Sequence, residues 1–233
     1  LALEQDYRII APDAYALQGV FDLETVCRAL VRGLDTEGID RASVVGISAG
    51  GGVAQVLLQA YPERVDHVVL SHCGALQQSS GADRRTTWML WLVRLLPLTV
   101  IHRVLKRMTT GGIPTTSRWA AFHEAYMEEA VERIDRDALV GFLRSGLEAR
   151  SQFEFDPDAL ASWSGSILVL SSRDDALSRD RVEELTARYP RAEIRLLNEG
   201  GHHAFLFFPE AYTSTLEAFL TARTPQGGMA KVV

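Results

Sequence analysis

Three residue types in this chain can together perform nucleophilic chemistry: a serine, a histidine and an aspartate. Ser48 lies in Gly46-Ile47-Ser48-Ala49-Gly50, a G-x-S-x-G pattern, and His202 follows a pair of glycines. Asp174 and Asp175 stand between them in the chain. A serine hydroxyl becomes a good nucleophile when a base takes its proton, and an acid usually orients that base. The order serine, aspartate, histidine therefore predicts attack by Ser48 on a carbonyl group, with His202 as the base.

The surroundings of Ser48 favour this interpretation. A predicted strand, 42–47, ends just before it, and a predicted helix, 50–61, begins just after it. This is the strand–turn–helix context of a nucleophile elbow. Glycines two residues before and two after the serine are expected there, because larger side chains would collide with neighbouring backbone. The Ala49 amide, at the helix start, can donate to an oxyanion. A glycine-rich turn without chemistry is the alternative reading.

Strand and helix patterns alternate along most of the chain and are needed to position these residues. Apolar runs predict strands at 7–11, 42–47, 65–70, 167–170 and 193–197. Helices are expected from the Asp22 cap to residue 34, over 50–61 and 178–189, and from Pro209 onward. This alternation predicts an α/β fold, a mostly parallel sheet flanked by helices. Ser48, the Asp174-Asp175 pair and His202 would then share the carboxyl edge of the sheet.

One interval breaks the alternation. Residues 77–162 contain helical patterns and no convincing strand. We therefore expect a core of residues 1–76 and 163–223, a helical cap or lid insertion at 77–162, and a flexible tail at 224–233. The insertion's apolar segment 88–105 includes Pro97 and several basic residues, so it is a poor membrane span. We expect a helix pair packed on the main sheet, whose inner face can touch an apolar substrate; membrane-surface attachment is the less favoured alternative.

Composition excludes several functional classes. The 233 residues are 47% hydrophobic, enough for a sizeable core, and the net charge of −6 comes without the basic patch of a nucleic-acid-binding protein. Cys27 and Cys73 are too few for a disulfide framework or a four-ligand zinc site. No metal-ligand spacing or phosphate-binding loop is present, so we expect no metal and no cofactor. We expect a cytoplasmic protein with a small-molecule substrate, no nucleic-acid partner and no integral membrane segment, and homo-oligomer formation stays open.

From Tyr7 to about Leu220, the chain resembles the α/β-hydrolase family. The resemblance rests on the elbow around Ser48, the acid loop 173–177 and the Gly201-His202 loop, and segments 7–13 and 61–65 are also typical. It implies Ser48 as nucleophile, His202 as base and an aspartate as the third member of a triad.

The resemblance also ranks the two adjacent aspartates as candidates for the acid and the two adjacent histidines as candidates for the base. The family's acid usually precedes a proline-like position, which implies Asp175, with Ser172 and Ala176 in place of the usual glycine and proline. Asp174 remains an alternative to Asp175, and His203 a weaker alternative to His202. The remaining histidines, His67, His72, His102 and His123, are interpreted as surface or hydrogen-bonded core residues.

The activity that the resemblance implies is hydrolysis of an ester or thioester through an acyl-enzyme, as in a carboxylesterase. A serine at the elbow disfavours the family's dehalogenases, which use aspartate there. Carbon–carbon bond hydrolases, lactonases and cofactor-free peroxidases stay open, since one fold hosts many reactions. The rival from another class is a non-catalytic hydrolase-fold protein that acts as a binding or scaffold module.

The resemblance finally predicts a gap in the sheet. The family has three more strands before the one at Tyr7, and the third carries a loop that supplies a second oxyanion donor. That strand lies between the equivalents of 7–11 and 42–47, and nothing in residues 1–6 replaces it. We therefore expect a longer protein, or a gap that is closed by re-pairing or by another chain. The segment after Pro12-Asp13 also lacks the family's usual Gly-x-Gly-x-Ser run.

Overall fold

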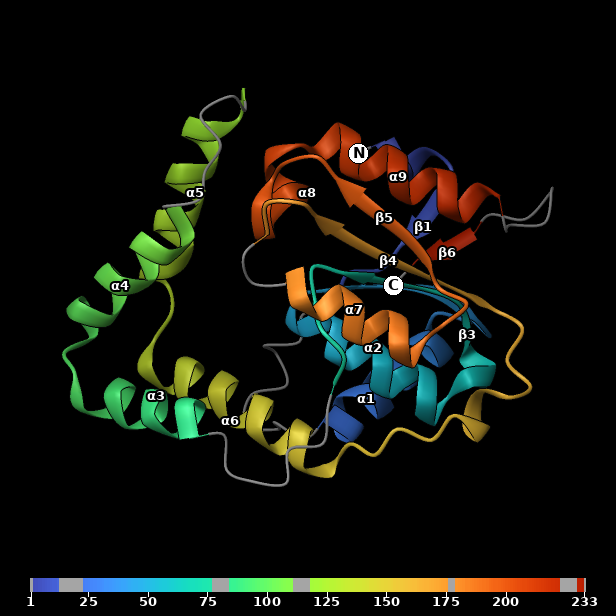
Figure 1. Cartoon of the computed structure of the whole chain (residues 1–233), viewed down its shortest axis with the longest axis horizontal. Helices are drawn as coiled ribbons and strands as arrows, with labels where there is room; N and C mark the ends of the chain where they lie inside the picture. The colour runs from blue at the N-terminus through green and yellow to red at the C-terminus, as the bar shows by residue number, and fades with distance from the viewer. Residues whose placement is uncertain are drawn as a thin grey trace.

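The computed structural model describes residues 2–12, 23–76, 84–110, 118–175, 179–222 and 230–232. Within these ranges the chain forms a parallel sheet of strand order β1-β6-β2-β3-β4-β5, with helices on both faces (Figure 1). Four neighbouring strands carry the site: β2 (Ala42–Ile47), β3 (Val65–Ser71), β4 (Ser166–Ser172) and β5 (Glu193–Leu197). The α/β fold predicted from the alternation of strands and helices is confirmed.

Helices cover the two faces of the sheet because its central strands are apolar on both sides. Val68 and Leu70 of β3 face a core formed with α1 (Leu23–Thr36), α2 (Ala49–Ala60) and α7 (Arg179–Arg188). Val69 points to the other face, which α9 (Pro209–Thr221) covers. Side chains alternate along a strand, so a continuous apolar run requires burial on both sides. The predicted helix cap at Asp22 lies outside the described residues.

Short elements complete the core. They are β1 (Tyr7–Ile9), α8 (Ala204–Phe207) and the 3₁₀ turns η1 (Ala2–Gln5), η3 (Pro62–Arg64), η4 (Asp158–Leu160) and η5 (Gly201–His203). The last of these turns, η5, follows β5 and carries His202. A single turn at this place fixes the histidine close to the end of its strand.

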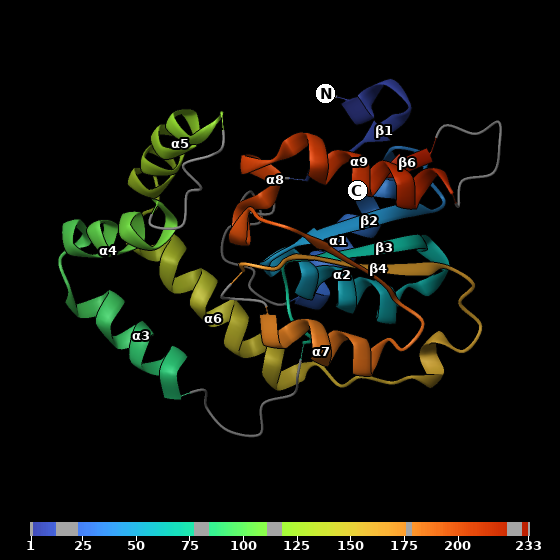
Figure 2. The same cartoon turned by 45° about the horizontal axis from the view of Figure 1, so that its top comes forward.

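Among the described residues, four α-helices stand between β3 and β4 and lie to one side of the sheet (Figure 2). These insertion helices are α3 (Arg84–Leu95), α4 (Leu98–Thr110), α5 (Ala120–Glu132) and α6 (Arg136–Gln152). These helices fall within the predicted insertion 77–162, of which 77–83 and 111–117 lie outside the described residues. No helix in the described ranges is both long and apolar enough to span a membrane.

The expected packing of segment 88–105 on the main sheet is wrong. Val93 of α3 and Ile101 of α4 are buried against Leu143 of α6, in a small core that the insertion helices form among themselves. Leu139 and Val140 of α6 border the same core. The apolar stripe of α6 meets the stripes of α3 and α4, so these helices do not need the sheet to bury their inner faces.

The predicted gap in the sheet is filled from within the chain. β6 (Ala230–Val232) lies between β1 and β2 and is parallel to both, with Tyr7 opposite Ala230 and Ser43 opposite Val232. Backbone N–H and C=O groups of β1 and β2 need partners when they are buried, and β6 supplies them. Residues 230–232 of the predicted tail thus pair with the sheet, and residues 223–229 lie outside the described ranges.

Candidate active site

The predicted site residues meet at one edge of the sheet. Ser48 follows β2, Asp175 follows β4 and His202 follows β5, and these strands run parallel. The Ser48 Oγ lies 2.8 Å from His202 Nε2, and His202 Nδ1 lies 3.2 Å from Asp175 Oδ2. When Nδ1 carries the proton it donates to Asp175, and Nε2 is free to accept the serine proton. The structure thus brings the three side chains into one line of hydrogen bonds.

The turn at Ser48 has an unusual backbone. Its φ of 53° and ψ of −115° fall in a region that side-chain-bearing residues rarely adopt. The Ser48 amide donates to the carbonyl of Ser71 at 2.9 Å, which fastens the turn to the end of β3. Such strain costs on the order of 1–3 kcal/mol and persists only where its surroundings impose it. The result is an exposed hydroxyl at the end of a buried strand.

Close packing explains only part of the glycine pattern. A Cβ on Gly46 would lie 2.5 Å from the carbonyl oxygen of Gly50, so the collision expected before the serine is confirmed. Gly50 itself faces open space, and the collision expected there is wrong. The tight position on the helix side is Gly51, whose Cβ would lie 2.3 Å from the Cys73 sulfur. Gly51 packs against the segment after β3, while Gly50 contributes only its backbone to the close approach.

The two neighbouring aspartates have different partners. The side chain of Asp175 is 1% exposed and accepts the hydrogen bond from His202. The carboxylate of Asp174 accepts the backbone N–H groups of Gly200 and Gly201, at 3.2 and 2.9 Å. Asp174 therefore fastens the turn that carries His202, and Asp175 contacts its ring.

The histidine loop depends on its two glycines. Gly200 and Gly201 have φ values of 125° and 54°, where glycine is strongly favoured. A Cβ on Gly200 would also lie 2.6 Å from the Cβ of Ala204. This turn directs His202 toward Ser48, while the His203 ring lies 5.4 Å from the His202 ring and packs near Phe207. Burial lowers the pKa of His203.

A buried histidine, His72, lies at the same edge of the sheet and completes a chain of polar side chains. The sequence pattern identified it only as a surface or hydrogen-bonded core residue. His72, 1% exposed, follows β3 with a φ of 49°. Its Nδ1 lies 2.9 Å from Ser71 Oγ and its Nε2 lies 2.9 Å from Ser172 Oγ. The Tyr212 hydroxyl donates to Ser71 Oγ at 2.9 Å. The signal that could have indicated it is its place two residues after the predicted strand 65–70, beside the strand end that carries Ser48.

The pKa of His72 gives a prediction on stability. Burial, the largest cause, lowers this pKa from 6.5 to about 4. As pH falls from about 6.5 to about 4, the unfolded chain therefore binds a proton at His72 that the folded chain does not bind. The free energy of unfolding decreases over this range. Between pH 7 and pH 5, His72 is expected to account for a loss of about 2 kcal/mol in the free energy of unfolding. Urea unfolding at the two pH values measures this loss.

The matched variant for this experiment is His72→Asn, since asparagine tolerates a positive φ and does not titrate. The variant is expected to be less stable than the parent at pH 7, yet to lose about 2 kcal/mol less between pH 7 and pH 5. An unchanged pH difference would show that His72 is charged in the folded protein or already neutral in the unfolded one.

The other histidines lie away from Ser48 in contact with backbone or rings. His67 Nδ1 accepts the Ser166 N–H at 3.2 Å, and His102 Nε2 lies 2.8 Å from the carbonyl oxygen of Ile134. His123, 3% exposed, packs edge-on against Phe207, with a ring-centroid distance of 5.1 Å. His67 and His102 thus fit the interpretation as hydrogen-bonded residues, whereas His123 is buried with no hydrogen-bond partner among the described residues.

Both cysteines are buried, and neither forms a disulfide. Cys27 belongs to the core on the α1 and α2 face, as the sequence pattern indicates. Cys73, whose surroundings the sequence did not reveal, packs against Gly51, and burial raises its pKa to about 12. Among the described residues, no three His, Cys, Asp or Glu side chains gather as a metal ion would require.

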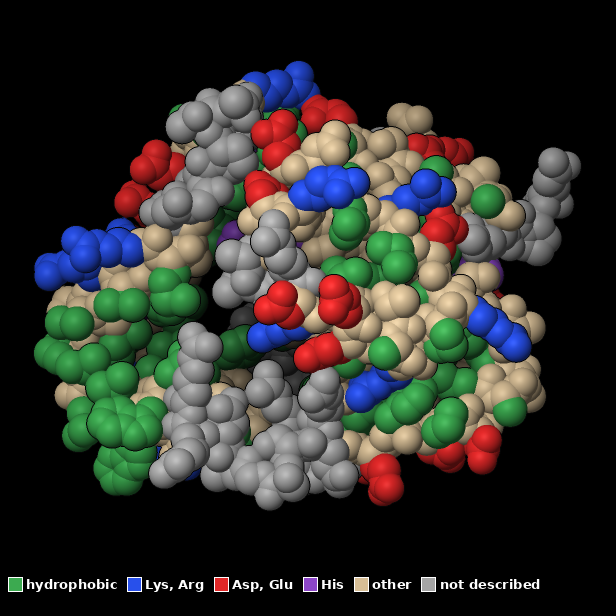
Figure 3. Space-filling model, in the orientation of Figure 1, with side chains coloured by type: hydrophobic (Ala, Val, Ile, Leu, Met, Phe, Trp, Pro, Cys, Tyr) green, Lys and Arg blue, Asp and Glu red, His purple; other side chains and the backbone are tan. Residues whose placement is uncertain are grey.

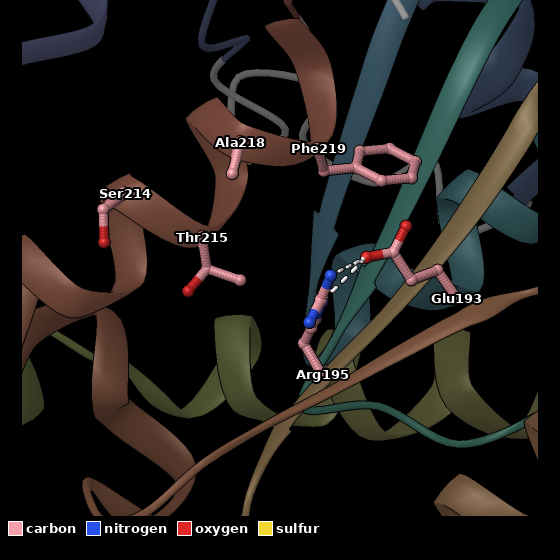
Figure 4. A pocket seen from close by; sticks show the side chains of 6 residues that line it. All are labelled: Glu193, Arg195, Ser214, Thr215, Ala218 and Phe219. Atoms are coloured by element: carbon pink, nitrogen blue, oxygen red, sulfur yellow. Dashed lines mark hydrogen bonds and ion pairs between the residues drawn. The ribbon is translucent and has the colours of Figure 1, made fainter. Parts of the chain in front are cut away.

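A separate hollow lies between α9 and β5, on the face that α9 covers. Its volume is about 300 Å³, and its lining residues are Glu193, Arg195, Ser214, Thr215, Ala218 and Phe219 (Figure 4). Glu193 and Arg195 are ion-paired at 2.7 Å and point into it. Ser48, Asp175 and His202 do not line this hollow, so it is not a substrate pocket for them.

Known proteins resemble this chain in sequence and in structure. A 2-hydroxy-6-oxononadienedioate/2-hydroxy-6-oxononatrienedioate hydrolase of Dechloromonas aromatica is 27% identical over 199 residues, which cover 85% of this chain and 68% of that protein. The enol-lactonase of Burkholderia xenovorans has a similar structure, with a TM-score of 0.68 at 17% identity, covering 86% of this chain and 73% of that one. A thermophilic esterase of Thermogutta terrifontis also has a TM-score of 0.68, at 21% identity, with coverage of 88% and 75%.

These structural similarities show that the proteins share one fold. A sequence model of one family also matches most of this chain. The model of the alpha/beta hydrolase family matches residues 1–215, a range that contains β1 to β5 and all three of Ser48, Asp175 and His202. The chain therefore belongs to the alpha/beta hydrolase family.

Proposed function

We propose that this protein is a serine hydrolase in which Ser48 is the nucleophile, His202 the general base and Asp175 the orienting acid. The observation that carries the proposal is the unbroken line of hydrogen bonds between them. Ser48 Oγ and His202 Nε2 are 2.8 Å apart, and His202 Nδ1 and Asp175 Oδ2 are 3.2 Å apart. The strained backbone of Ser48 supports it, because such strain gathers at functional sites.

The reaction follows from these contacts. His202 Nε2 takes the hydroxyl proton while Ser48 Oγ bonds to a substrate carbonyl carbon, and Asp175 stabilises the imidazolium. Negative charge develops on the carbonyl oxygen, near the Ala49 N–H at the start of α2. This N–H group has no acceptor within its own helix and can donate to the oxygen. The leaving group takes the proton from His202 as its bond to the acyl carbon breaks. Water, deprotonated by the same histidine, then releases the acid from Ser48.

An ester or thioester is the substrate class we propose first. An alkoxide or thiolate leaving group needs one proton, and the His202 imidazolium supplies it in place. The insertion helices lie beyond the strand ends that carry the site, so a partly apolar acyl or alcohol group is the expected substrate portion.

Cleavage of a carbon–carbon bond is a second candidate, and one observation favours it. The relative from Dechloromonas aromatica carries the name of a hydrolase of 2-hydroxy-6-oxo dienedioates. In such a substrate the bond broken joins a carbonyl carbon to another carbon. The leaving carbon must then hold an electron pair, which a conjugated ketone, the keto tautomer of the substrate, can accept as an enolate. The same triad attacks in both reactions, and the substrate decides which bond breaks.

Labelling with a fluorophosphonate probe tests the proposal. An activated serine reacts with the probe, whereas an ordinary surface serine does not, so one equivalent of label on the peptide containing Ser48 is expected. Activity is then compared on p-nitrophenyl esters, acyl thioesters and a 2-hydroxy-6-oxo dienoate, followed by absorbance. Absence of label at Ser48, with no turnover of any substrate, would favour the binding or scaffold alternative. Turnover of the dienoate alone would move the assignment to the second candidate.

A further inference from the structure

The insertion helix α3 exposes an apolar face to solvent. Its outer stripe consists of large side chains with high exposed fractions: Trp88 (69%), Trp91 (58%), Leu92 (43%) and Leu95 (73%). Their spacing of three and four residues places them on one side of the helix. Leu90 and Val93 lie on the other side and belong to the core shared with α6. A helix that is apolar on two sides needs a second apolar environment.

This stripe is directed away from the catalytic core. Figures 1 and 2 both place α6 between α3 and the core, so the face opposite α6 is an outer one. Hydrophobic side chains gather over α3 in the space-filling view, and Lys and Arg side chains lie over the neighbouring α4 (Figure 3). On α4, Val104 (51%) and Met108 (66%) extend the exposed apolar surface. The stripe is therefore not part of a lining for the Ser48 site.

The charged side chains of α3 and α4 themselves have one sign, while α5, which packs on α4, contributes glutamates beside Lys106. Residues 84–110, which form α3 and α4, hold six of the chain's 24 basic residues and none of its 30 acidic ones. Lys106 is paired with Glu132 of α5 at 2.8 Å. Arg94, Arg103 and Arg107 are exposed, and no ion pair joins them to another described residue. These three arginines thus lie near the apolar stripe without an ion-pair partner among the described residues, in a protein whose net charge is −6.

We propose that the outer face of α3 and α4 docks on the surface of an anionic lipid bilayer. Trp88, Trp91 and Leu95 enter the boundary between headgroups and acyl chains, where tryptophan is favoured. Arg103 and Arg107 lie on the outer side of α4 and contact headgroup phosphates. The protein lies on the membrane by this face and does not span it. Docking brings the insertion helices to a source of apolar substrates. This membrane contact is a separate property from the chemistry proposed for Ser48.

Charge decides between this occupant and a second copy of the chain. A symmetric dimer through the same face would bring the like-charged arginines of the two copies together. Such a contact is repulsive, and it would leave the cations without counter-charges. An anionic bilayer accepts the apolar stripe and neutralises the arginines in one contact, so it is the occupant that the composition of this face favours.

Vesicle co-sedimentation tests the proposal and uses the full chain with the Ser48→Ala change, so that binding is read without turnover. Phosphatidylcholine vesicles are compared with vesicles that also contain phosphatidylglycerol. Binding is expected on the anionic vesicles, with a blue shift of tryptophan emission and a decrease at high salt. Arg103→Gln/Arg107→Gln is expected to weaken it about 25-fold, at roughly fivefold per cation. Trp88→Gln/Trp91→Gln should weaken it at least as much, because the inserted apolar area is lost.

Control variants separate this face from the general surface. Arg133→Gln and Arg195→Gln remove exposed cations elsewhere, on the segment after α5 and on β5, and both should bind as the parent does. Equal binding of the parent to both kinds of vesicle, or none to either, would overturn the proposal. So would a dimer in solution that the tryptophan changes dissociate, which would identify the face as a contact between copies. Neither outcome bears on the label at Ser48.

Discussion

Replacing Ser48 with alanine is expected to lower kcat by about 10⁴- to 10⁶-fold on any substrate that the protein turns over. The change removes the oxygen that lies 2.8 Å from His202 Nε2, and no other hydroxyl of the described residues makes that contact. The remaining activity would come from binding and from oxyanion stabilisation near Ala49. Steady-state rates and fluorophosphonate labelling of the purified variant measure both losses.

Stability measurements distinguish a lost nucleophile from a lost fold. Alanine keeps the Cβ and therefore the strain of the φ of 53°, so the melting temperature should stay near that of the parent. Ser48→Gly also removes the nucleophile but relieves the strain, and it should be more stable than Ser48→Ala by about 1 kcal/mol. If Ser48→Ala retained full turnover, the chemistry proposed for this residue would be abandoned.

Asp175→Asn is expected to lower kcat by about 10⁴-fold, the second large effect. Asp175 Oδ2 accepts from His202 Nδ1 in the parent, at 3.2 Å. An amide nitrogen at this place donates instead, so Nδ1 becomes the acceptor and the proton moves to Nε2. His202 then points an N–H at Ser48 and has no lone pair to take its proton. The pH–rate profile and kcat of the variant report this change of tautomer.

Asp174→Asn is the matched control, one residue away in the same loop. Its carboxylate binds the N–H groups of Gly200 and Gly201, so asparagine keeps one acceptor oxygen and weakens the turn. A fall in kcat of about tenfold is expected, with a loss of stability of about 1 kcal/mol. The opposite ranking, with Asp174→Asn the more damaging for kcat, would transfer the role of the acid from Asp175 to Asp174.

The local sequence determined the four strands that carry the site, the elbow and the loop that holds the histidine. Apolar runs bounded by turns gave β2, β3, β4 and β5 within one or two residues of their observed ends. A buried strand and an amphipathic helix carry their periodicity in the residues themselves. The meeting of Ser48 and His202 also followed, because parallel strands place their carboxyl ends at one edge whatever the distance along the chain.

Contacts between distant segments decided the rest. The choice between Asp174 and Asp175 depends on which carboxylate reaches the His202 ring and which reaches the glycine amides. The pairing of β6 with β1 and β2, and the buried partners of His72, likewise join segments far apart in the chain. Periodicity gives the type of an element and the presence of an apolar face. It does not say which surface that face will meet, as the outer stripe of α3 shows, because that depends on the packing of the whole chain.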